Sequence, residues 1–421
     1  MKTSYIKTRI SFILIIVSLF VLPFTVNARE TRMDLFGADN DTIKVSLLTC
    51  SPGKRIYELY GHTGIRVNIP ARRFDAVYHY GVFSFNTPHF TYRFVKGETD
   101  YSIGIMPYYD FVSMYAERGS EVRELPLNLT AEETQRLFKA LNINALPSNA
   151  VYRYSFLYDN CATRPRDIIA RNVDGYLVYS PQAVFPTYRD MIHYSTRSYP
   201  WMTFGIDLLL GKEVDCRVDF VATPFLPTAT ETLLAEASVE EPGGALRPLA
   251  TGEPKVVLKS SVVPTEPSIF TTLLTPWVVN LVLLLAVLCV TVVELRRGKH
   301  CKILDTLLFA IFGTTGVLIY FLLLFSEHPA VSSNYNALWL HPFWYVAAAA
   351  IWINKAGKFL YYYHFINFAL VLGLILAFAF IPQKINTACI PLMVILLVRS
   401  FAYIAVEKGA FRKAPAIKTD E

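Results

Sequence analysis

Residues 158–169 read YDNCATRPRDII, and this stretch decides how the first half of the chain is interpreted. Asn160 is a favoured helix N-cap residue and Pro165 is tolerated only near a helix start, so we expect a helix to begin at or shortly after Cys161. A helix N-terminus carries about half a positive charge and free amide donors, which favour thiolate over thiol. The stretch is therefore typical of an activated cysteine.

Cys161 nevertheless allows two interpretations. Free cysteines are common in protein cores, so the residue also fits a small core position. The flanking Arg164 and Arg166 favour the first interpretation, because two cations near the sulfur would stabilise a thiolate. Such a nucleophile needs a proton carrier, which at neutral pH is a histidine.

Two histidines in the first half of the chain lie where strands are expected. His62 lies in YGHTGIRV, where the glycines indicate a tight bend that leads into a strand. His79 lies in VYHYG, within a run of Tyr and Val that is typical of a strand. Either side chain also fits a structural histidine. The spacings HxxxH, CxxC and HExxH do not occur, so we expect neither a metal site nor a cofactor.

Residues 29–222 are enough for one α+β domain with its own core. Short strands are expected at 43–48, 63–68 and 76–83. The sequence TAEE at 130–133 is a capping box that opens a helix. Strands therefore come first in this domain and helices follow.

The composition, 53% hydrophobic and 18% charged residues, differs from that of a soluble protein, which has about 25% charged residues. Spanning a bilayer core takes roughly 20 apolar residues. We expect an all-α bundle of five transmembrane helices at 272–407, with a marginal third run of 16 residues. The apolar runs are 274–293, 304–325, 338–353, 360–381 and 390–406.

The orientation follows from the basic residues between these runs, because cytoplasmic loops are enriched in Lys and Arg. Basic clusters follow the first, third and fifth runs, whereas the alternate loops contain only Lys384. The pattern places residues 29–270 outside the cytoplasm and the tail 408–421 inside it. The net charge of +6 reflects this bias and gives no indication of nucleic-acid binding.

The remaining segments are interpreted from composition. Residues 1–28 have the basic start, apolar run and small-residue exit of a secretory signal peptide, with an uncleaved anchor as the alternative. Residues 223–271 are rich in Pro, Ala, Thr and Glu and contain PGG at 242–244, so we expect a connector there. It could still contribute one helix and one strand to the domain.

Three cysteines, Cys50, Cys161 and Cys216, fall in the outer part of the chain. An odd number in an oxidising compartment implies one free thiol. A disulfide between Cys50 and Cys216 would leave Cys161 free, whereas any disulfide that uses Cys161 would remove the proposed nucleophile. The sequence does not decide the pairing.

The order of histidine, strands, and then an Asn-Cys helix resembles the circularly permuted papain-like fold of the superfamily that includes NlpC-type peptidases and lecithin:retinol acyltransferase. More closely, nearly the whole chain resembles the Lnb family, named after a bacterial lipoprotein N-acyltransferase. The DNCATRPRD run is the most specific part of this resemblance. The motifs are TCSPG at 49–53, YGH at 60–62, HYGVF at 79–83, YR at 92–93, KG at 96–97, DNCATRPRD at 159–167 and PW at 200–201.

The resemblance implies a role for each site residue. Cys161 would be the nucleophile and His62 the base. The third, orienting residue would be His79, which lies within the expected strand, with Asp75 as the alternative. The Cys161 amide and the Asn160 side chain would hold the oxyanion, supported by Arg164 and Arg166.

The resemblance also implies a function at the bacterial inner membrane. A phospholipid would donate an acyl chain to Cys161, and the α-amine of a diacyl lipoprotein's N-terminal cysteine would accept it. Three alternatives stay open: a membrane-anchored NlpC-like cell-wall peptidase, a lipid ester hydrolase, and a non-enzymatic membrane sensor or scaffold. A peptidase would not need five spans.

Two further features lie in the membrane part of the chain. The loop 326–342 contains Asn334, Asn336 and His341, which could bind a headgroup or a lipoprotein N-terminus, or could belong to an ordinary interfacial belt. Arg399 falls inside the fifth run, where a charge must either reach the cytoplasmic surface or pair within the bundle.

Overall fold

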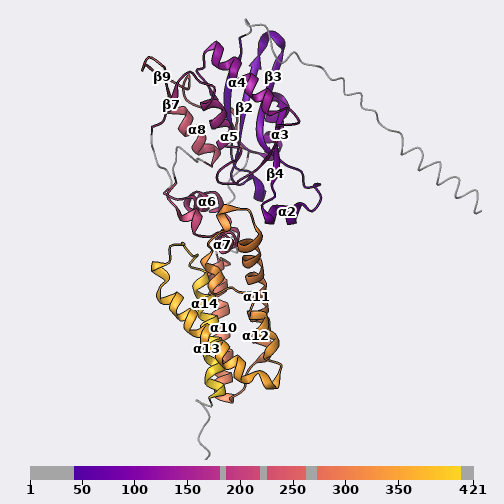
Figure 1. The fold of residues 1–421 in the computed structure, drawn as a ribbon, viewed down its shortest axis with the longest axis vertical. Coiled ribbons are helices and arrows are strands. Elements are labelled where there is room, and N and C mark those ends of the chain that lie inside the picture. The colour runs from indigo at the N-terminus through magenta and orange to yellow at the C-terminus, as the bar shows by residue number, and fades with distance from the viewer. Residues whose placement is uncertain (1–41, 181–185, 219–224, 262–272, 409–421) are drawn as a thin grey trace, which may run out of the picture. The chain divides into compact units, whose positions relative to one another are not determined.

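The computed structural model describes residues 42–180, 186–218, 225–261 and 273–408 (Figure 1). The expected signal segment 1–28 and nearly all of the tail 408–421 lie outside these ranges. The described residues belong to one compact unit. Below, the outer domain means the described part of 42–261, and the bundle means 273–408.

A seven-stranded antiparallel sheet organises the outer domain, in the order β10-β5-β1-β2-β3-β4-β6. Its central strands correspond to the three strands expected from the sequence, and the α+β class is confirmed. The strands are β1 Lys44–Cys50, β2 His62–Ile69, β3 Phe74–Val82, β4 Asp100–Pro107, β5 Val122–Pro126, β6 Val151–Arg153 and β10 Lys255–Leu258.

Helices cover both faces of this sheet because side chains alternate between the faces along each strand. In β1, Leu47 packs with α4 (Ala131–Asn144) and α5 (Thr163–Ala170), whereas Leu48 packs on the opposite face with α3 (Tyr108–Arg118). The expected capping box is present: Thr130 and Glu133 exchange backbone-to-side-chain hydrogen bonds of 2.7 and 3.2 Å. The sheet is thus buried on both sides.

The segment 223–271, expected as a connector, also contributes to the domain core. Its described part forms α8 (Pro227–Ala235), whose Leu233 and Leu234 are buried, and supplies the edge strand β10. A small second sheet has the order β7-β8-β9. Its strands are β7 Tyr176–Val178, β8 Ser238–Glu240 and β9 Leu246–Pro248.

Four helices of the bundle are long and apolar enough to cross a membrane. A count of five spanning helices is not confirmed, because the third run contains only α12 (Trp344–Ala350). Pro342 explains the difference, since proline lacks a backbone donor and interrupts a helix. The long helices are α10 Pro276–Arg297, α11 Lys302–Phe325, α13 Gly357–Leu376 and α14 Cys389–Glu407.

The third run nevertheless passes along α11 in the opposite direction. Tyr320 donates a hydrogen bond to the Ala337 carbonyl at 3.4 Å, and the Trp352 indole donates to Thr306 at 2.9 Å. The broken segment therefore contacts both the carboxyl-terminal half of α11 and its first turns. It returns the chain to the other end of the bundle, as the positions of the basic loops require.

Arg399 pairs within the bundle. Its guanidinium is 1% exposed and donates to Asp305 at 2.6 and 2.9 Å, and to Glu294 at 2.9 Å. These carboxylates come from α11 and α10, so one side chain of α14 links three helices. Of the two alternatives that the sequence left open, pairing is the one observed.

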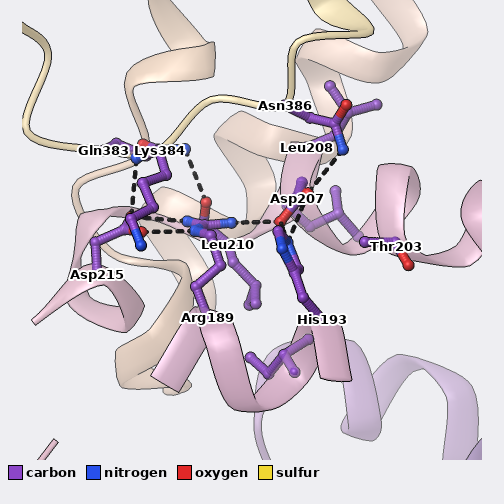
Figure 2. A network of polar contacts seen from close by, with 12 residues as sticks. Arg189, His193, Thr203, Asp207, Leu208, Leu210, Asp215, Gln383, Lys384 and Asn386 are labelled. Atoms are coloured by element: carbon purple, nitrogen blue, oxygen red, sulfur yellow. Dashed lines mark hydrogen bonds and ion pairs between the residues drawn. The ribbon is translucent and has the colours of Figure 1, made fainter. Parts of the chain in front are cut away.

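A second buried ionic network joins the outer domain to the bundle (Figure 2). It centres on Asp207 in α7 (Pro200–Leu209), which accepts hydrogen bonds from Arg189 at 2.6 Å and His193 at 2.9 Å, both in α6 (Tyr188–Thr196). Asn386, between α13 and α14, donates to the same carboxylate at 2.8 Å. Arg189 also binds Asp215 at 2.8 and 3.0 Å. We call this set the joint.

Removing the central carboxylate tests the joint. Asp207→Ala leaves the fully buried Arg189 with one of its two carboxylates, and breaking such a buried pair costs about 3 kcal/mol. Thermal unfolding of the detergent-solubilised protein should then have a midpoint roughly 6 °C lower. The matched control is Asp174→Ala, which breaks an exposed pair with Arg136 worth about 0–1 kcal/mol. Equal midpoints for the two variants would contradict a stabilising joint.

The same stabilisation should depend on pH. Burial alone would raise the pKa of Asp207, but the hydrogen bond from His193 and the charge of Arg189 outweigh burial and lower it. This contribution is therefore complete above the pKa of an unfolded aspartate, about 3.9, and is lost as the pH falls through the lower folded value. Above pH 5 the midpoint difference between wild type and Asp207→Ala should stay constant.

Candidate active site

Asn160 shapes the backbone at the start of α5. Its Oδ1 accepts hydrogen bonds from the amides of Ala162 at 2.7 Å and Thr163 at 3.1 Å. Its Nδ2 donates to the Phe156 carbonyl at 2.7 Å. The side chain therefore caps the helix, and the helix begins just after Cys161, as the sequence predicts. Because the amide group is engaged on both sides, Asn160 positions the cysteine and is not aimed at an oxyanion.

The Cys161 sulfur lies beside the first residues of β2. The Thr63 amide, the Tyr154 hydroxyl and its own amide all lie near enough to lower the pKa of the thiol. Thr63 directly follows His62, so the sulfur lies next to the backbone of the proposed base. A Cβ on Gly81 in β3 would lie 3.8 Å from the Cys161 Cβ and 3.1 Å from the Tyr154 ring. Glycine, with φ of +88°, thus leaves space beside the sulfur.

His62 and His79 form a hydrogen-bonded pair across neighbouring strands. His79 lies opposite Gly64, two residues beyond His62, which places both histidines on one face of the sheet. The His62 Nε2 and His79 Nδ1 atoms are 3.2 Å apart. The Tyr115 ring stacks on the His62 ring, with centroids 6.4 Å apart. Asp75, the alternative third residue, instead binds Arg66 at 2.6 Å.

Burial keeps the proposed nucleophile, Cys161, and the proposed base, His62, uncharged. Burial, with the charges of His79 and Arg118, lowers the pKa of His62 to about 3. Burial and Arg118 lower the pKa of His79 to about 4. Burial raises the pKa of Cys161 to about 11, even though the Thr63 amide, the Tyr154 hydroxyl and its own amide oppose this rise. At neutral pH Cys161 therefore rests as a thiol and both histidines as neutral imidazoles, in contrast to the thiolate that the sequence suggested.

Arg164 and Arg166 do not supply the expected positive field at the sulfur. Arg164 binds Asp159 through two hydrogen bonds of 2.5 and 2.7 Å and stacks over the Tyr152 ring at 3.4 Å. Arg166 pairs with Asp167. Because each guanidinium has an adjacent carboxylate, their net effect on the cysteine is small, and the expectation of cationic support is wrong.

The loop residues expected to bind substrate are engaged in the fold. Asn334, 5% exposed, donates to the Leu208 carbonyl at 2.8 Å, and the fully buried Asn336 donates to the Asp207 carbonyl at 3.2 Å. His341 bonds Asn367 at 3.0 Å. The two asparagines therefore satisfy the last carbonyls of α7 and belong to the contact between domain and bundle, which corrects their assignment as an open binding site.

The outer cysteines are all free. Cys50 ends β1 and is buried under Tyr115, with which it hydrogen-bonds, whereas Cys216 is exposed. A disulfide between them is therefore absent, because one thiol lies inside the sheet and the other on the surface. Within the described ranges, no three His, Cys, Asp or Glu side chains are grouped so as to hold a metal ion.

The sequence did not indicate three contributors to this site: Thr63, Tyr154 and Arg118. Thr63 acts through its backbone amide, which any residue could provide. Tyr154 is one of many tyrosines, and only the fold brings β6 to the cysteine. Burial, with the charge of Cys161, raises the pKa of the Tyr154 phenol well above its usual value, so the hydroxyl remains a hydrogen-bond donor.

Comparison with known proteins gave two matches to family models. Residues 35–194 match a model described as the Lnb N-terminal periplasmic domain, and residues 267–409 match one described as the Lnb transmembrane domain. Together they cover more than half of the chain. No curated protein and no solved structure matched it.

The protonation state of Cys161 can be tested by alkylation of the folded protein. With a pKa of about 11, the thiolate fraction should rise about tenfold per pH unit between pH 7 and 9.5, and the iodoacetamide rate with it. Peptide mass spectrometry would follow Cys161, with the exposed Cys216 as an internal reference for reagent access. A fast, pH-independent reaction of Cys161 near pH 7 would instead indicate a thiolate–imidazolium pair.

Proposed function

The chain belongs to the Lnb family, and on this premise we propose that it is an N-acyltransferase that moves an acyl chain from a phospholipid to the α-amine of a lipoprotein's N-terminal cysteine. It is a multi-pass inner-membrane protein with a periplasmic domain. One observation carries the proposal: a buried cysteine at a helix start lies by the backbone amide of Thr63, and the residue before Thr63 is His62, which is hydrogen-bonded to His79, in a domain joined to membrane helices.

The first half-reaction would acylate Cys161. The sulfur attacks the carbonyl carbon of a phospholipid ester while its proton passes to His62 Nδ1. The carbon–oxygen bond then breaks, and His62 returns the proton to the departing lysophospholipid oxygen. The products are a thioester on Cys161 and a lysophospholipid. The neutral thiol and imidazole of the resting site suit this step, in which the proton moves with the attack.

The second half-reaction would transfer the chain. The free α-amine attacks the thioester carbonyl, a nitrogen–carbon bond forms, and the carbon–sulfur bond breaks. One amine proton passes through His62 to the sulfur, which restores the thiol. Splitting the transfer in this way predicts ping-pong kinetics.

His79 would orient the base. With the His62 Nε2–H donating to His79 Nδ1, the other His62 nitrogen, Nδ1, keeps its lone pair for the cysteine proton. The same hydrogen bond stabilises the imidazolium that forms during the reaction. This requires a neutral His79, which its lowered pKa provides.

The oxyanion would be held by the Cys161 amide and the Tyr154 hydroxyl. Both act to lower the pKa of the thiol, so they lie near the sulfur to which the tetrahedral carbon would be bonded. The neighbouring amides of Ala162 and Thr163 are occupied by Asn160. Loss of one such donor typically costs about a hundredfold or more in turnover.

Replacement of the proposed nucleophile and base tests these roles. Cys161→Ala and Cys161→Ser should abolish transfer, because a hydroxyl is far less nucleophilic at neutral pH. His62→Ala should lower it by about 10²–10⁴-fold, and His62→Gln should be no better because glutamine does not titrate. Cys216→Ser is the matched control and should retain activity. Turnover by Cys161→Ala at the wild-type rate would contradict the mechanism.

Trapping the acyl-enzyme tests the reaction order. Purified protein in detergent, given phospholipid without acceptor, should gain the mass of one acyl chain on the peptide that contains Cys161, and neutral hydroxylamine should remove it. Addition of a diacyl lipopeptide should then give an acylated peptide. An adduct on Cys50 would exclude the proposed nucleophile, whereas cleaved muropeptide or only free fatty acid would identify a peptidase or a hydrolase.

A further inference from the structure

A connected group of aromatic side chains leads away from the Cys161 pocket. We call Phe83, Phe85, Phe90, Phe94 and Phe156 the aromatic strip. They come from the loop after β3, from α2 (Phe90–Lys96), and from the loop before Cys161. These segments are distant in sequence, so only the fold creates the strip.

The rings contact one another and end at the Cys161 pocket. The ring centroid of Phe94 lies 6.1 Å from that of Phe90 and 5.8 Å from that of Phe156. Phe156 in turn contacts Tyr154, with ring centroids 5.2 Å apart. Phe90 stacks on Phe83 at 5.7 Å. Because the Tyr154 hydroxyl bonds the Cys161 sulfur, apolar surface continues up to the reacting atom.

The other end of the strip lies on the outer end of membrane helix α11. Tyr92, in α2, contacts Phe321, with ring centroids 6.2 Å apart. The Glu327 amide donates to the Lys96 carbonyl at 2.7 Å, and the His328 Nε2 bonds the Phe94 carbonyl at 2.8 Å. The strip therefore continues the apolar surface of α11, where Leu324 and Phe325 are 70% and 59% exposed.

The strip is exposed although it is apolar. Phe85 is 60% exposed, Phe94 38% and Phe156 37%. A small pocket of about 30 Å³ lies beside it, and its lining combines Phe83 and Phe90 with charged residues such as Arg93 and Asp100. Contiguous exposed apolar surface of this kind marks a binding site in a folded protein.

The charges around the strip restrict its occupant. Arg93 binds Asp100 at 2.6 Å, Lys96 pairs with Glu98, and Arg153 binds Glu327 at 2.6 Å. Each of these three cations has a carboxylate partner, so none of the three offers an unmatched positive charge for a phosphate. The surface suits an uncharged, apolar ligand.

From these observations we propose that the aromatic strip binds the acyl chain of the donor phospholipid, from the outer end of α11 to the Cys161 pocket. The inference rests on the proposed function. Each methylene of the acyl chain that leaves the bilayer would be exposed to water, which is unfavourable. A nucleophile outside the membrane core therefore needs an apolar surface along which the chain can lie. The strip provides one from the membrane helix to the sulfur.

Photo-crosslinking tests occupancy separately from chemistry. The full-length Cys161→Ala protein in nanodiscs would receive a phosphatidylethanolamine with a diazirine at the end of one palmitoyl chain. Crosslinks are expected on the peptides that contain Phe85 and residues 90–94. Crosslinks confined to the transmembrane helices would overturn the proposal, as would labelling of the strip that a hundredfold excess of unmodified lipid does not compete.

Kinetics with chain-length variants separate this inference from the proposed function. Phe85→Ser and Phe94→Ser should slow acylation of Cys161 by dipalmitoyl phosphatidylethanolamine roughly tenfold each, because contact with the chain is lost. Both should react like wild type with a soluble butyryl ester. Tyr176→Ser, at an 80% exposed aromatic in β7, is the matched control and should match wild type with both donors.

The outcomes are distinct. Wild-type protein that forms no acyl-enzyme with either donor would contradict the proposed function. Acylation of wild type with no effect of the strip variants would overturn the strip alone. Equal losses with long and short donors would also overturn it, because they would indicate damage to the fold. A strip that served as a protein contact would likewise show no dependence on chain length.

Discussion

The buried ion pair between Arg189 and Asp207 is the constraint on which the rest of this structure depends. The proposed acyl transfer would need Cys161 at a defined position relative to the bilayer. The pair provides this, because Asp207 is held by α6 on one side and by Asn386 of the bundle on the other (Figure 2). Removing two charges from water costs several kcal/mol per ion, so loss of either partner would leave the other charge buried and unpaired. Asn334 and Asn336 extend the same contact through the last carbonyls of α7.

The bundle uses the same chemistry a second time. Arg399 with Glu294 and Asp305 joins α14, α10 and α11, where an unpaired charge would be costly. The third apolar run could not add a full spanning helix, since Pro342 interrupts it, and its irregular backbone packs against α11. Non-helical backbone at this depth is tolerated only where protein surrounds it. The ionic contacts and the broken segment together fix the relative positions of the helices.

The sequence predicted the class of the fold, the helix start at Cys161 and the two histidines, because each depends on local features: capping residues, glycine bends and apolar periodicity. It failed where the result depends on contacts between distant segments. Burial by such segments, not the helix dipole, dominates the pKa of Cys161. The prediction also missed a local effect, because the carboxylates that match Arg164 and Arg166 are Asp159 and Asp167 of the same stretch. Asn334 and Asn336 were predicted to bind substrate because nothing in the sequence shows that α7 ends against them.

Burial of the site has one consequence for both half-reactions. A thioester is open to attack by water, and a transferase must prefer an amine. Cys161 is only 9% exposed and lies near Tyr154, so little water reaches it. The same desolvation that raises the pKa of the thiol would favour the uncharged form of an incoming amine, because a buried ammonium loses its proton more readily. In the proposed mechanism, burial of Cys161 would therefore both disfavour hydrolysis of the thioester and favour the uncharged form of the acceptor amine.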